Sequence, residues 1–370
     1  MRIDYFMPTR VVMGENCVFD SRELFAGLGK KAMLVTGRNS AKLNGAQADV
    51  EKALVANGQA RALYDKVMSN PSVECIREIV DAIGAEQCDF VIAIGGGSPL
   101  DAGKAAAALA YAPETKSALL FSTSFTSALP IVAIPSTAGT GSEVTRNAVL
   151  TNHHIKNKAS MAGPAMFPRC AFLDARYLST LSMSTTINTA VDALSHAIEG
   201  MLSIRASLFS DMLAKESISL IAKCYRRGDF GRQTREELFS ASTLAGMVIT
   251  NTGTVAAHAM GYMLTYNRNI DHGRATGLLL GEFLRFAQKT EQGKHAGRIN
   301  EILASLDISS LDEFCSILDT LFRASGPYER FERSELEAYA AQAVRAKNRA
   351  NGIAKPSEQD ILDIFVKSLT

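Results

Sequence analysis

The chain is 370 residues long, the length of about two domains. Its 39 lysines and arginines balance 38 aspartates and glutamates, which argues against a nucleic-acid-binding protein with its concentrated basic excess. No apolar stretch approaches the roughly 18 residues of a membrane span, and no apolar segment follows the charged N-terminus MRIDYFMPTR as it would in a secretory signal. We therefore expect a cytoplasmic protein with neither nucleic acid nor membrane as a partner.

The first half of the chain alternates strand and helix patterns. Short apolar runs that end in turn residues predict strands at residues 31–36, 60–67, 90–94 and 130–134. Apolar spacings of three and four residues predict helices at residues 49–56, 73–85 and 101–111. Alternating strands and helices form parallel sheets covered by helices, so we expect a Rossmann-like α/β domain over residues 1–181.

From about Ser182 the pattern changes to a helical period with few strand-like runs. The predicted helices cover residues 189–202, 210–225, 235–249, 255–264, 273–286 and 336–344. This change of period predicts a domain boundary and an all-helical domain over residues 182–370.

A glycine-rich turn follows the predicted strand 90–94 and opens a helix, with the sequence Gly-Gly-Gly-Ser-Pro. Residues without a Cβ let a diphosphate approach the backbone, and the amides at a helix N-terminus donate to it. Asp101 could orient a polar group nearby, and Lys104 is spaced to reach a phosphate. The spacing matches neither the dinucleotide fingerprint nor the P-loop, so a plain tight turn stays the alternative.

A second loop, PSTAGTGSE at residues 135–143, follows the predicted strand 130–134. It offers several hydroxyls and unhindered amides. Loops of open α/β sheets gather at the carboxyl ends of the strands, where ligands bind. A solvated loop has the same composition, and the presence of two such loops at one sheet edge favours a binding site.

Four polar residues of the second half predict a metal site. Asp192 and His196 are four residues apart on one face of an apolar helix, where burying both is costly unless a cation compensates. A plain hydrogen bond between them is the alternative. His258 lies in an apolar segment fourteen residues before His272, and a helix–turn–helix could bring these imidazoles together. Three imidazoles and one carboxylate suit Fe²⁺ or Zn²⁺ better than Mg²⁺ or Ca²⁺.

The chain resembles the iron-containing (group III) alcohol dehydrogenases over nearly its whole length. Four motifs carry this resemblance by their order and spacing: the glycine turn, the second loop, the segment 192–199 (DALSHAIE) and the histidine pair. The resemblance implies a dehydroquinate-synthase-like architecture with a nucleotide-binding domain, a helical domain and an active-site cleft. It also implies an oxidoreductase that transfers hydride between a small alcohol and NAD(P), giving an aldehyde or ketone, with the substrate oxygen at a divalent metal.

The resemblance further assigns residues. The implied metal ligands are Asp192, His196, His258 and His272, with Fe²⁺ expected before Zn²⁺. The implied cofactor-binding residues are Asn39, Ser40, Asn70, Gly95, Gly96, Gly97, Ser98, Pro99, Asp101, Ser136, Thr137, Thr140 and Lys158. Members of the family commonly form homodimers, and we expect one here.

Two positions depart from the family pattern. Many members carry a substrate-facing histidine four residues after the third metal ligand, and here that residue is Tyr262, which we expect to face the substrate. NAD-preferring members often have an aspartate just after the first strand. Here the segment reads Gly-Arg-Asn-Ser at residues 37–40, with Lys42 close by, which favours a 2′-phosphate and predicts a preference for NADP(H).

Three other functions stay open. The nearest is a glycerol or polyol dehydrogenase of the same family. A dehydroquinate-synthase-like lyase would need several basic residues, for which Arg268 and Arg274 are the candidates beside His272. A nucleotide-binding protein without catalysis is the third. Glu199, on the face of Asp192 and His196, is either a partner of a metal ligand or a surface or helix-capping residue.

Overall fold

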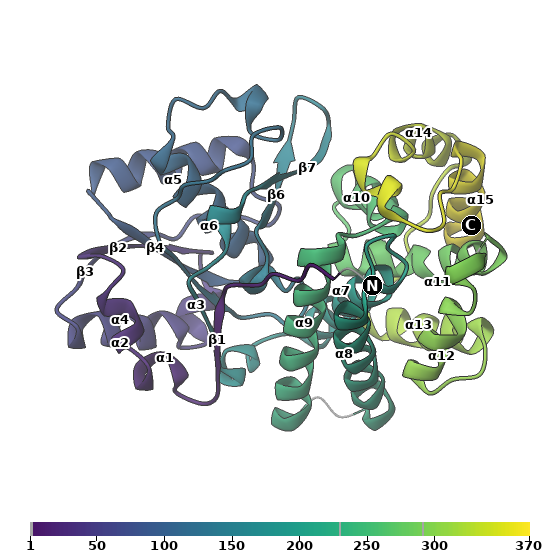
Figure 1. The fold of residues 1–370 in the computed structure, drawn as a ribbon, viewed down its shortest axis with the longest axis horizontal. Helices are drawn as coiled ribbons and strands as arrows, with labels where there is room; N and C mark the ends of the chain where they lie inside the picture. Colours follow the sequence, from purple (N-terminus) through teal and green to yellow (C-terminus); the bar gives the residue numbers. More distant parts are fainter. Residues whose placement is uncertain (1–2, 229–230, 291) are drawn as a thin grey trace. The chain divides into compact units, whose positions relative to one another are not determined.

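The computed structural model describes residues 3–228, 231–290 and 292–370. The chain divides into two compact units, one of residues Met7–Leu181 and one of Ser182–Thr370 with the N-terminal residues through Phe6 (Figure 1). Tyr5 and Phe6 join the helical unit because the Phe6 amide donates to Asn251 Oδ1 (3.0 Å) and the Tyr5 ring meets Phe209 edge to face. Met1 and Arg2, at the start of the predicted first domain, lie outside the described residues.

A six-stranded parallel sheet forms the centre of the α/β unit. The strands lie in the order β1 (Arg10–Met13), β8 (Cys170–Leu173), β5 (Ile131–Pro135), β4 (Phe90–Gly95), β2 (Lys31–Thr36) and β3 (Ala60–Tyr64). Thr36 pairs with Ile94, and Gly95 pairs with Pro135. The loops after β2, β4 and β5 therefore leave the sheet side by side.

Both faces of this sheet are buried, as expected for parallel strands. Alternate residues of β4 point to opposite apolar layers: Val91 joins one layer, and Ile92 joins the other. Helices α5 (Val73–Ala85) and α6 (Gly97–Tyr111) cover the first face. The second face is covered by α1 (Cys17–Asp20), α2 (Glu23–Ala26), α3 (Ser40–Leu43) and α4 (Ala46–Ala56).

The sequence did not predict an antiparallel hairpin, β6 (Asn147–Asn152) and β7 (Asn157–Ala162), which packs on α6. The unit also contains four short 3₁₀ turns. They are η1 (Ser117–Leu119), η2 (Ser142–Val144), η3 (Pro164–Met166) and η4 (Ala175–Leu178).

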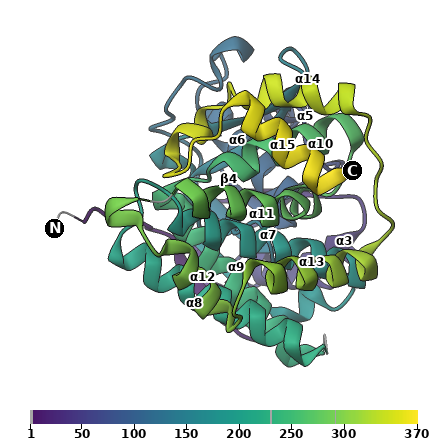
Figure 2. The same ribbon diagram turned by 90° about the vertical axis from the view of Figure 1, so that its right-hand side faces the viewer.

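The second unit is built from helices, and no strand occurs in its described part. The helices are α7 (Met183–Met201), α8 (Leu208–Arg227), α9 (Arg232–Thr252), α10 (Ala256–Arg268), α11 (His272–Thr290), α12 (Arg298–Leu306), α13 (Leu311–Ser325), α14 (Arg333–Ala343) and α15 (Glu358–Leu369), with the turns η5 (Gly293–His295) and η6 (Lys347–Asn351). Figure 2 shows α11 between the pair α14–α15 and the pair α12–α13. Together with the sheet, this confirms the predicted fold class.

No helix in the described part of the chain has the length and apolarity that a membrane crossing needs.

Candidate metal centre

Helix α7 carries two of the predicted ligands into the interior of the helical unit. It begins at Met183 because Ser182 caps it, with the Ser182 Oγ accepting the Thr185 amide at 3.0 Å. The helix packs against α8, α9, α11 and α13, so the side chains of Asp192 and His196 are both buried. Among the described residues, Asp192 Oδ1 has no hydrogen-bond partner. A buried carboxylate oxygen without a hydrogen bond is expensive unless a cation lies beside it.

Glu199, one turn after His196, brings the third predicted ligand to the same place. Its Oε2 accepts the backbone amides of Val255 (2.6 Å) and His258 (3.4 Å) at the start of α10. Its Oε1 contacts His258 Nδ1. The other ring nitrogen, Nε2, lies 3.8 Å from Asp192 Oδ1. The alternative that Glu199 is a surface residue is wrong, because its side chain is fully buried and has a partner at each oxygen.

His272 is the first residue of α11, and the close approach of this helix to α7 places it. Asn188 of α7 donates from Nδ2 to Asp271 Oδ2 at 2.9 Å. A Cβ on Gly273 would lie 1.9 Å from the Asn188 carbonyl oxygen, so only glycine allows this approach. His272 Nε2 is 4.0 Å from Asp192 Oδ1, and Nδ1 is 3.4 Å from the hydroxyl of Thr265.

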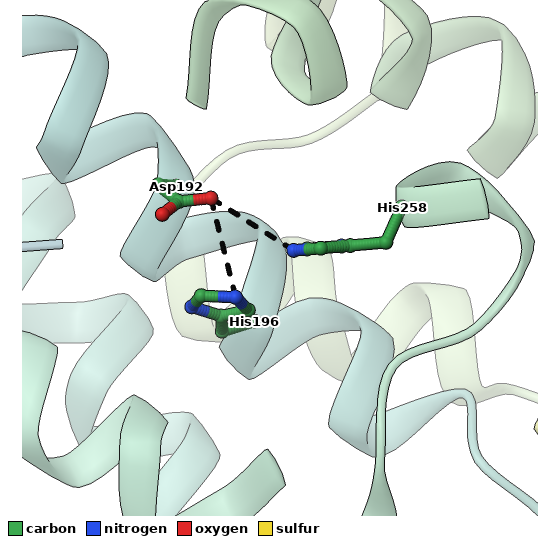
Figure 3. A group of neighbouring side chains, drawn as sticks. All are labelled: Asp192, His196 and His258. Atoms are coloured by element: carbon green, nitrogen blue, oxygen red, sulfur yellow. Dashed lines mark ion pairs between the residues drawn. The ribbon is translucent and has the colours of Figure 1, made fainter. Parts of the chain in front are cut away.

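Three of the four predicted ligands form a compact group: the ligand atoms of Asp192, His196 and His258 lie within 4.8 Å of one another, and His272 lies beside Asp192. The Nε2 atoms of His196, His258 and His272 lie 4.0, 3.8 and 4.0 Å from Asp192 Oδ1, and Figure 3 shows the first two of these contacts. These distances are too long for hydrogen bonds. Two atoms bound to one ion at about 2.1 Å each lie at most about 4.2 Å apart. The donor set and the bare oxygen of Asp192 thus fit a divalent ion such as Fe²⁺ or Zn²⁺.

Aromatic rings surround this centre. His196 stacks on His258 with ring centroids 4.6 Å apart. Tyr262, one turn after His258 on α10, stacks on His272 at 5.0 Å and meets His258 edge to face at 6.3 Å. Tyr262 is only half-buried. Its ring therefore forms a wall beside two predicted ligands, and its contact with a substrate stays a prediction.

The glycine turn and the hydroxyl-rich loop of the α/β unit lie against each other. Gly95 has φ +146°, a conformation that favours glycine. A Cβ on Gly96 would lie 3.1 Å from Thr137 Cγ2, and one on Gly97 would lie 2.6 Å from Thr140 Cγ2. The Ser136 amide donates to the Gly95 carbonyl at 2.9 Å. The two motifs thus form one surface at the N-terminus of α6, the kind of place where a diphosphate binds.

Other predicted cofactor residues join this surface. The Asn70 amide donates to Ser98 Oγ (3.2 Å), and the Thr151 hydroxyl donates to the Asn70 carbonyl (2.9 Å). Lys158 pairs with Thr151 across the β6–β7 hairpin. Asn70 therefore contacts the glycine turn directly, and Lys158 is linked to it by backbone pairing with Thr151, which bonds to Asn70.

Lys104 has a different role from the one the sequence predicted, whereas the contact of Asp101 with the cofactor stays a prediction. The prediction that Lys104 reaches a phosphate is wrong, because Nζ is buried and donates to the Ser142 carbonyl (3.0 Å) and to Thr145 Oγ1 (3.2 Å). Asp101 pairs with Lys104 (3.1 Å), and its second oxygen accepts the Val149 amide (2.8 Å). Burial lowers the pKa of Lys104, against the opposing effect of Asp101. The pair ties α6 to the loop after β5 and to β6.

At the end of β2, Asn39 and Ser40 are exposed and start the short helix α3. Lys42 in the same helix pairs with Asp65, which follows β3, at 2.7 Å. The ammonium of Lys42 lowers the pKa of the Asp65 carboxyl. The sequence did not reveal this role of Asp65. Its carboxylate lies beside Lys42, one of the cations on which the predicted preference for NADP(H) rests.

The two arginines that could support a lyase are engaged elsewhere. Arg274 donates to the Phe322 carbonyl (3.1 Å) and to the carboxylate of Glu329 (3.1 Å). Arg268 pairs with Glu335 at 2.7 Å. Both guanidinium groups bind the chain between the end of α13 and the start of α14, so neither supports the recognition of a phosphate or carboxylate substrate at His272.

Two family profiles match the chain over most of its length. The profile of the family "Iron-containing alcohol dehydrogenase" matches residues 8–175, and that of the "Fe-containing alcohol dehydrogenase family, C-terminal" matches residues 186–369. The chain is 34% identical over 261 residues to lactaldehyde reductase of Escherichia coli (strain K12), a match that covers 70% of this chain and 68% of that protein. It is 30% identical over 357 residues to NADPH-dependent butanol dehydrogenase of Clostridium saccharobutylicum, with 92% and 91% covered.

Among solved structures, the crystal structure of an iron-containing alcohol dehydrogenase from Thermotoga maritima matches with a TM-score of 0.91 and 36% identity, and the match covers 99% of each chain. The similarity thus extends over both units, in agreement with the motifs that the sequence analysis singled out. The chain belongs to the iron-containing alcohol dehydrogenase family.

Proposed function

We propose that this oxidoreductase interconverts a small alcohol and its aldehyde or ketone with NADP(H) as the preferred coenzyme, and that Asp192, His196, His258 and His272 hold an Fe²⁺ ion. The convergence of three imidazole Nε2 atoms on Asp192 Oδ1 carries the proposal. The choice of Fe²⁺ rests on the family, since the donor set accepts Zn²⁺ as well. We also propose a homodimer, as is common in the family.

The proposed reaction assigns roles to the metal ligands, to Tyr262 and to the N-terminus of α6. A divalent cation, when bound, polarises the oxygen of an alcohol or carbonyl group and makes the alcohol more acidic. The four ligand residues fix the position of that cation. Tyr262 walls the space beside His272 and shapes what can approach it. In the α/β unit, the amides at the start of α6 bind the coenzyme diphosphate, and the Gly95–Gly97 backbone allows its close approach.

The coenzyme preference rests on the end of β2. Residues 37–40 contain no carboxylate to accept the 2′- and 3′-hydroxyls of NAD, whereas Arg38 and Lys42 supply positive charge for a 2′-phosphate. The similarity to an NADPH-dependent butanol dehydrogenase supports the same preference. Asp65 opposes it, because its carboxylate compensates part of the Lys42 charge.

Two substitutions test this arrangement. Lys42→Ala is expected to lower the kcat/KM ratio of NADPH to NADH about tenfold, and Asp65→Asn to raise it several-fold, because each changes the charge near the 2′-phosphate by one. The ratio is measured by steady-state kinetics at low ionic strength, where exposed charges are screened least. A wild-type enzyme with a large kcat/KM advantage for NAD(H) would refute the preference itself. If the NADPH-to-NADH ratio of both variants equals that of the wild type, Lys42 does not contribute to the coenzyme preference.

The reaction is tested by metal analysis of anaerobically purified protein, followed by a panel of alcohols, polyols and aldehydes with both coenzymes. We expect one bound divalent ion per chain, turnover with small alcohols or aldehydes, and loss of turnover after chelation that Fe²⁺ restores. Glycerol as the best substrate would favour the polyol dehydrogenase. A metal-loaded protein without turnover on the whole panel would contradict the proposed function.

A further inference from the structure

Glu199 makes more contacts with His258 than a helix cap requires. Its Oε2 accepts the backbone amides of Val255 and His258, which are among the donors at the start of α10 that lack a partner within the helix. Its Oε1 contacts Nδ1 of the His258 ring. One carboxylate of α7 therefore holds both the backbone and the side chain of a residue on α10. Both Glu199 and His258 are buried, so water does not compete for these contacts.

The contact at Nδ1 decides which ring nitrogen carries the proton. A carboxylate accepts hydrogen bonds, so His258 donates from Nδ1. Its Nε2 then presents a lone pair toward Asp192 Oδ1, 3.8 Å away. The partner of His272 Nδ1 is different: it is the hydroxyl of Thr265, a group that either donates or accepts. Glu199 thus fixes the orientation and the tautomer of the His258 ring, whereas the Thr265 hydroxyl does not fix the tautomer of His272.

Glu199 also bears on the charge of the centre. Among the four predicted ligands, only Asp192 brings a formal negative charge, whereas the proposed ion carries two positive charges. The side chains of Asp192 and Glu199 are 3% and 0% exposed, so each interacts with the site in a medium of low dielectric constant. A carboxylate in contact with Nδ1 would make the His258 imidazole a stronger ligand for an ion bound at Nε2.

We propose that Glu199 is a positioning residue of the metal centre: it holds His258 in the orientation and tautomer in which Nε2 binds the ion, and it thereby raises the affinity of the chain for divalent metal. The inference rests on the proposed metal site and adds a fifth residue to it. Because Glu199 and two of the predicted ligands belong to α7, this one helix would organise the centre.

The substitution Glu199→Gln is a sharp test because a glutamine cannot keep all three contacts in which Glu199 accepts a hydrogen bond. If the amide oxygen caps α10, the amide NH₂ faces Nδ1 and favours the tautomer with the proton on Nε2, which blocks metal binding. If the amide oxygen faces Nδ1, the NH₂ group meets the amides of Val255 and His258 and loosens the start of α10. Either arrangement weakens the metal site with almost no change in side-chain volume.

The experiment measures metal affinity rather than turnover. Metal-free wild type and Glu199→Gln are titrated with Zn²⁺ in competition with a chromophoric chelator, and the Co²⁺-loaded forms are compared by their visible absorption. We expect affinity about 10- to 100-fold weaker in the variant and an altered Co²⁺ spectrum. Circular dichroism and thermal unfolding of the metal-free proteins establish that both are folded. A wild type that binds no metal would instead refute the proposed function.

The matched control is Asp211→Asn. Asp211 is a partly buried helix carboxylate of the same unit that accepts from Arg298 at 2.6 Å rather than from a histidine. This variant is expected to lose stability and to keep the metal affinity of the wild type. A fall in metal affinity equal to that of Glu199→Gln would mean that general loosening of the unit explains both, and would overturn the proposal.

A second variant of Glu199 and a double-mutant cycle of Glu199 with His258 complete the test. Glu199→Asp keeps the charge but is one methylene shorter, so its carboxylate cannot reach both α10 and Nδ1, and metal affinity is expected to fall. Unchanged metal affinity in either folded variant overturns the proposal. His258→Ala keeps three predicted ligands and is titrated at Zn²⁺ concentrations high enough to load them. In this background, Glu199→Gln is expected to change metal affinity less than twofold, because the residue acts through His258. An effect as large as in the wild type would assign Glu199 another role.

Discussion

Replacing His258 by alanine is expected to abolish metal retention during purification and to lower kcat/KM by about 10³-fold or more, since the proposed ion would polarise the reacting oxygen. His258 lies between the stacked ring of His196 and the edge-on ring of His272, and it is 1% exposed. Its removal leaves a cavity in the middle of the predicted ligands. It also leaves Glu199 as a buried carboxylate without its imidazole partner, so the metal-free variant is expected to unfold at lower temperature.

Metal content per chain and steady-state kinetics of anaerobically purified protein measure the outcome. His154→Ala, at an exposed histidine of the β6–β7 turn, is the matched control and is expected to retain both metal and turnover. Full activity of the metal-stripped His258→Ala variant would contradict the proposed centre. Retention of metal with loss of turnover would move His258 from metal binding to substrate binding.

Half of this centre could be predicted from local sequence. Asp192 and His196 are four residues apart in a helix whose other residues are apolar, so their common burial followed from the helical period. The position of His272 beside them depends on contacts across 83 residues, namely the Asn188–Asp271 hydrogen bond and the approach that Gly273 allows. Local spacing carries no information about such contacts. A glycine directly after a predicted ligand was the only local signal.

In the α/β unit, some elements could be predicted from the hydrophobic pattern of the sequence and others could not. The helix α5 was predicted with its observed ends, because its apolar positions mark one face and Ser72 caps it. The direction of Lys104 could not be predicted, because α6 is rich in alanine and has no amphipathic face to orient it. The strands β1 and β8 are four residues long, too short for a periodic pattern to stand out. The hairpin β6–β7 mixes polar and apolar residues and gives a weak strand signal.

Gly273→Ala is expected to lower stability by about 1 to 3 kcal/mol and to weaken metal binding, although it replaces none of the predicted ligands. The added Cβ would lie 1.9 Å from the Asn188 carbonyl oxygen and 2.8 Å from Asp192 Cβ. Both neighbours belong to the buried helix α7, so the start of α11 must move instead. His272 is the adjacent residue, and its Nε2 would move away from Asp192 Oδ1.

Thermal unfolding and chelator competition of metal-free protein measure the two effects separately. Gly84→Ala is the control: no atom beyond its own turn of helix lies within 4 Å of the position of its Cβ, and alanine favours a helix over glycine by about 0.5 to 1 kcal/mol. It is expected to leave metal affinity unchanged and stability equal or higher. Wild-type stability and metal affinity in Gly273→Ala would contradict the packing of α11 on α7. Weaker metal binding with all four ligands present would show that the distance between these helices, as well as the ligand side chains, determines the affinity of the centre.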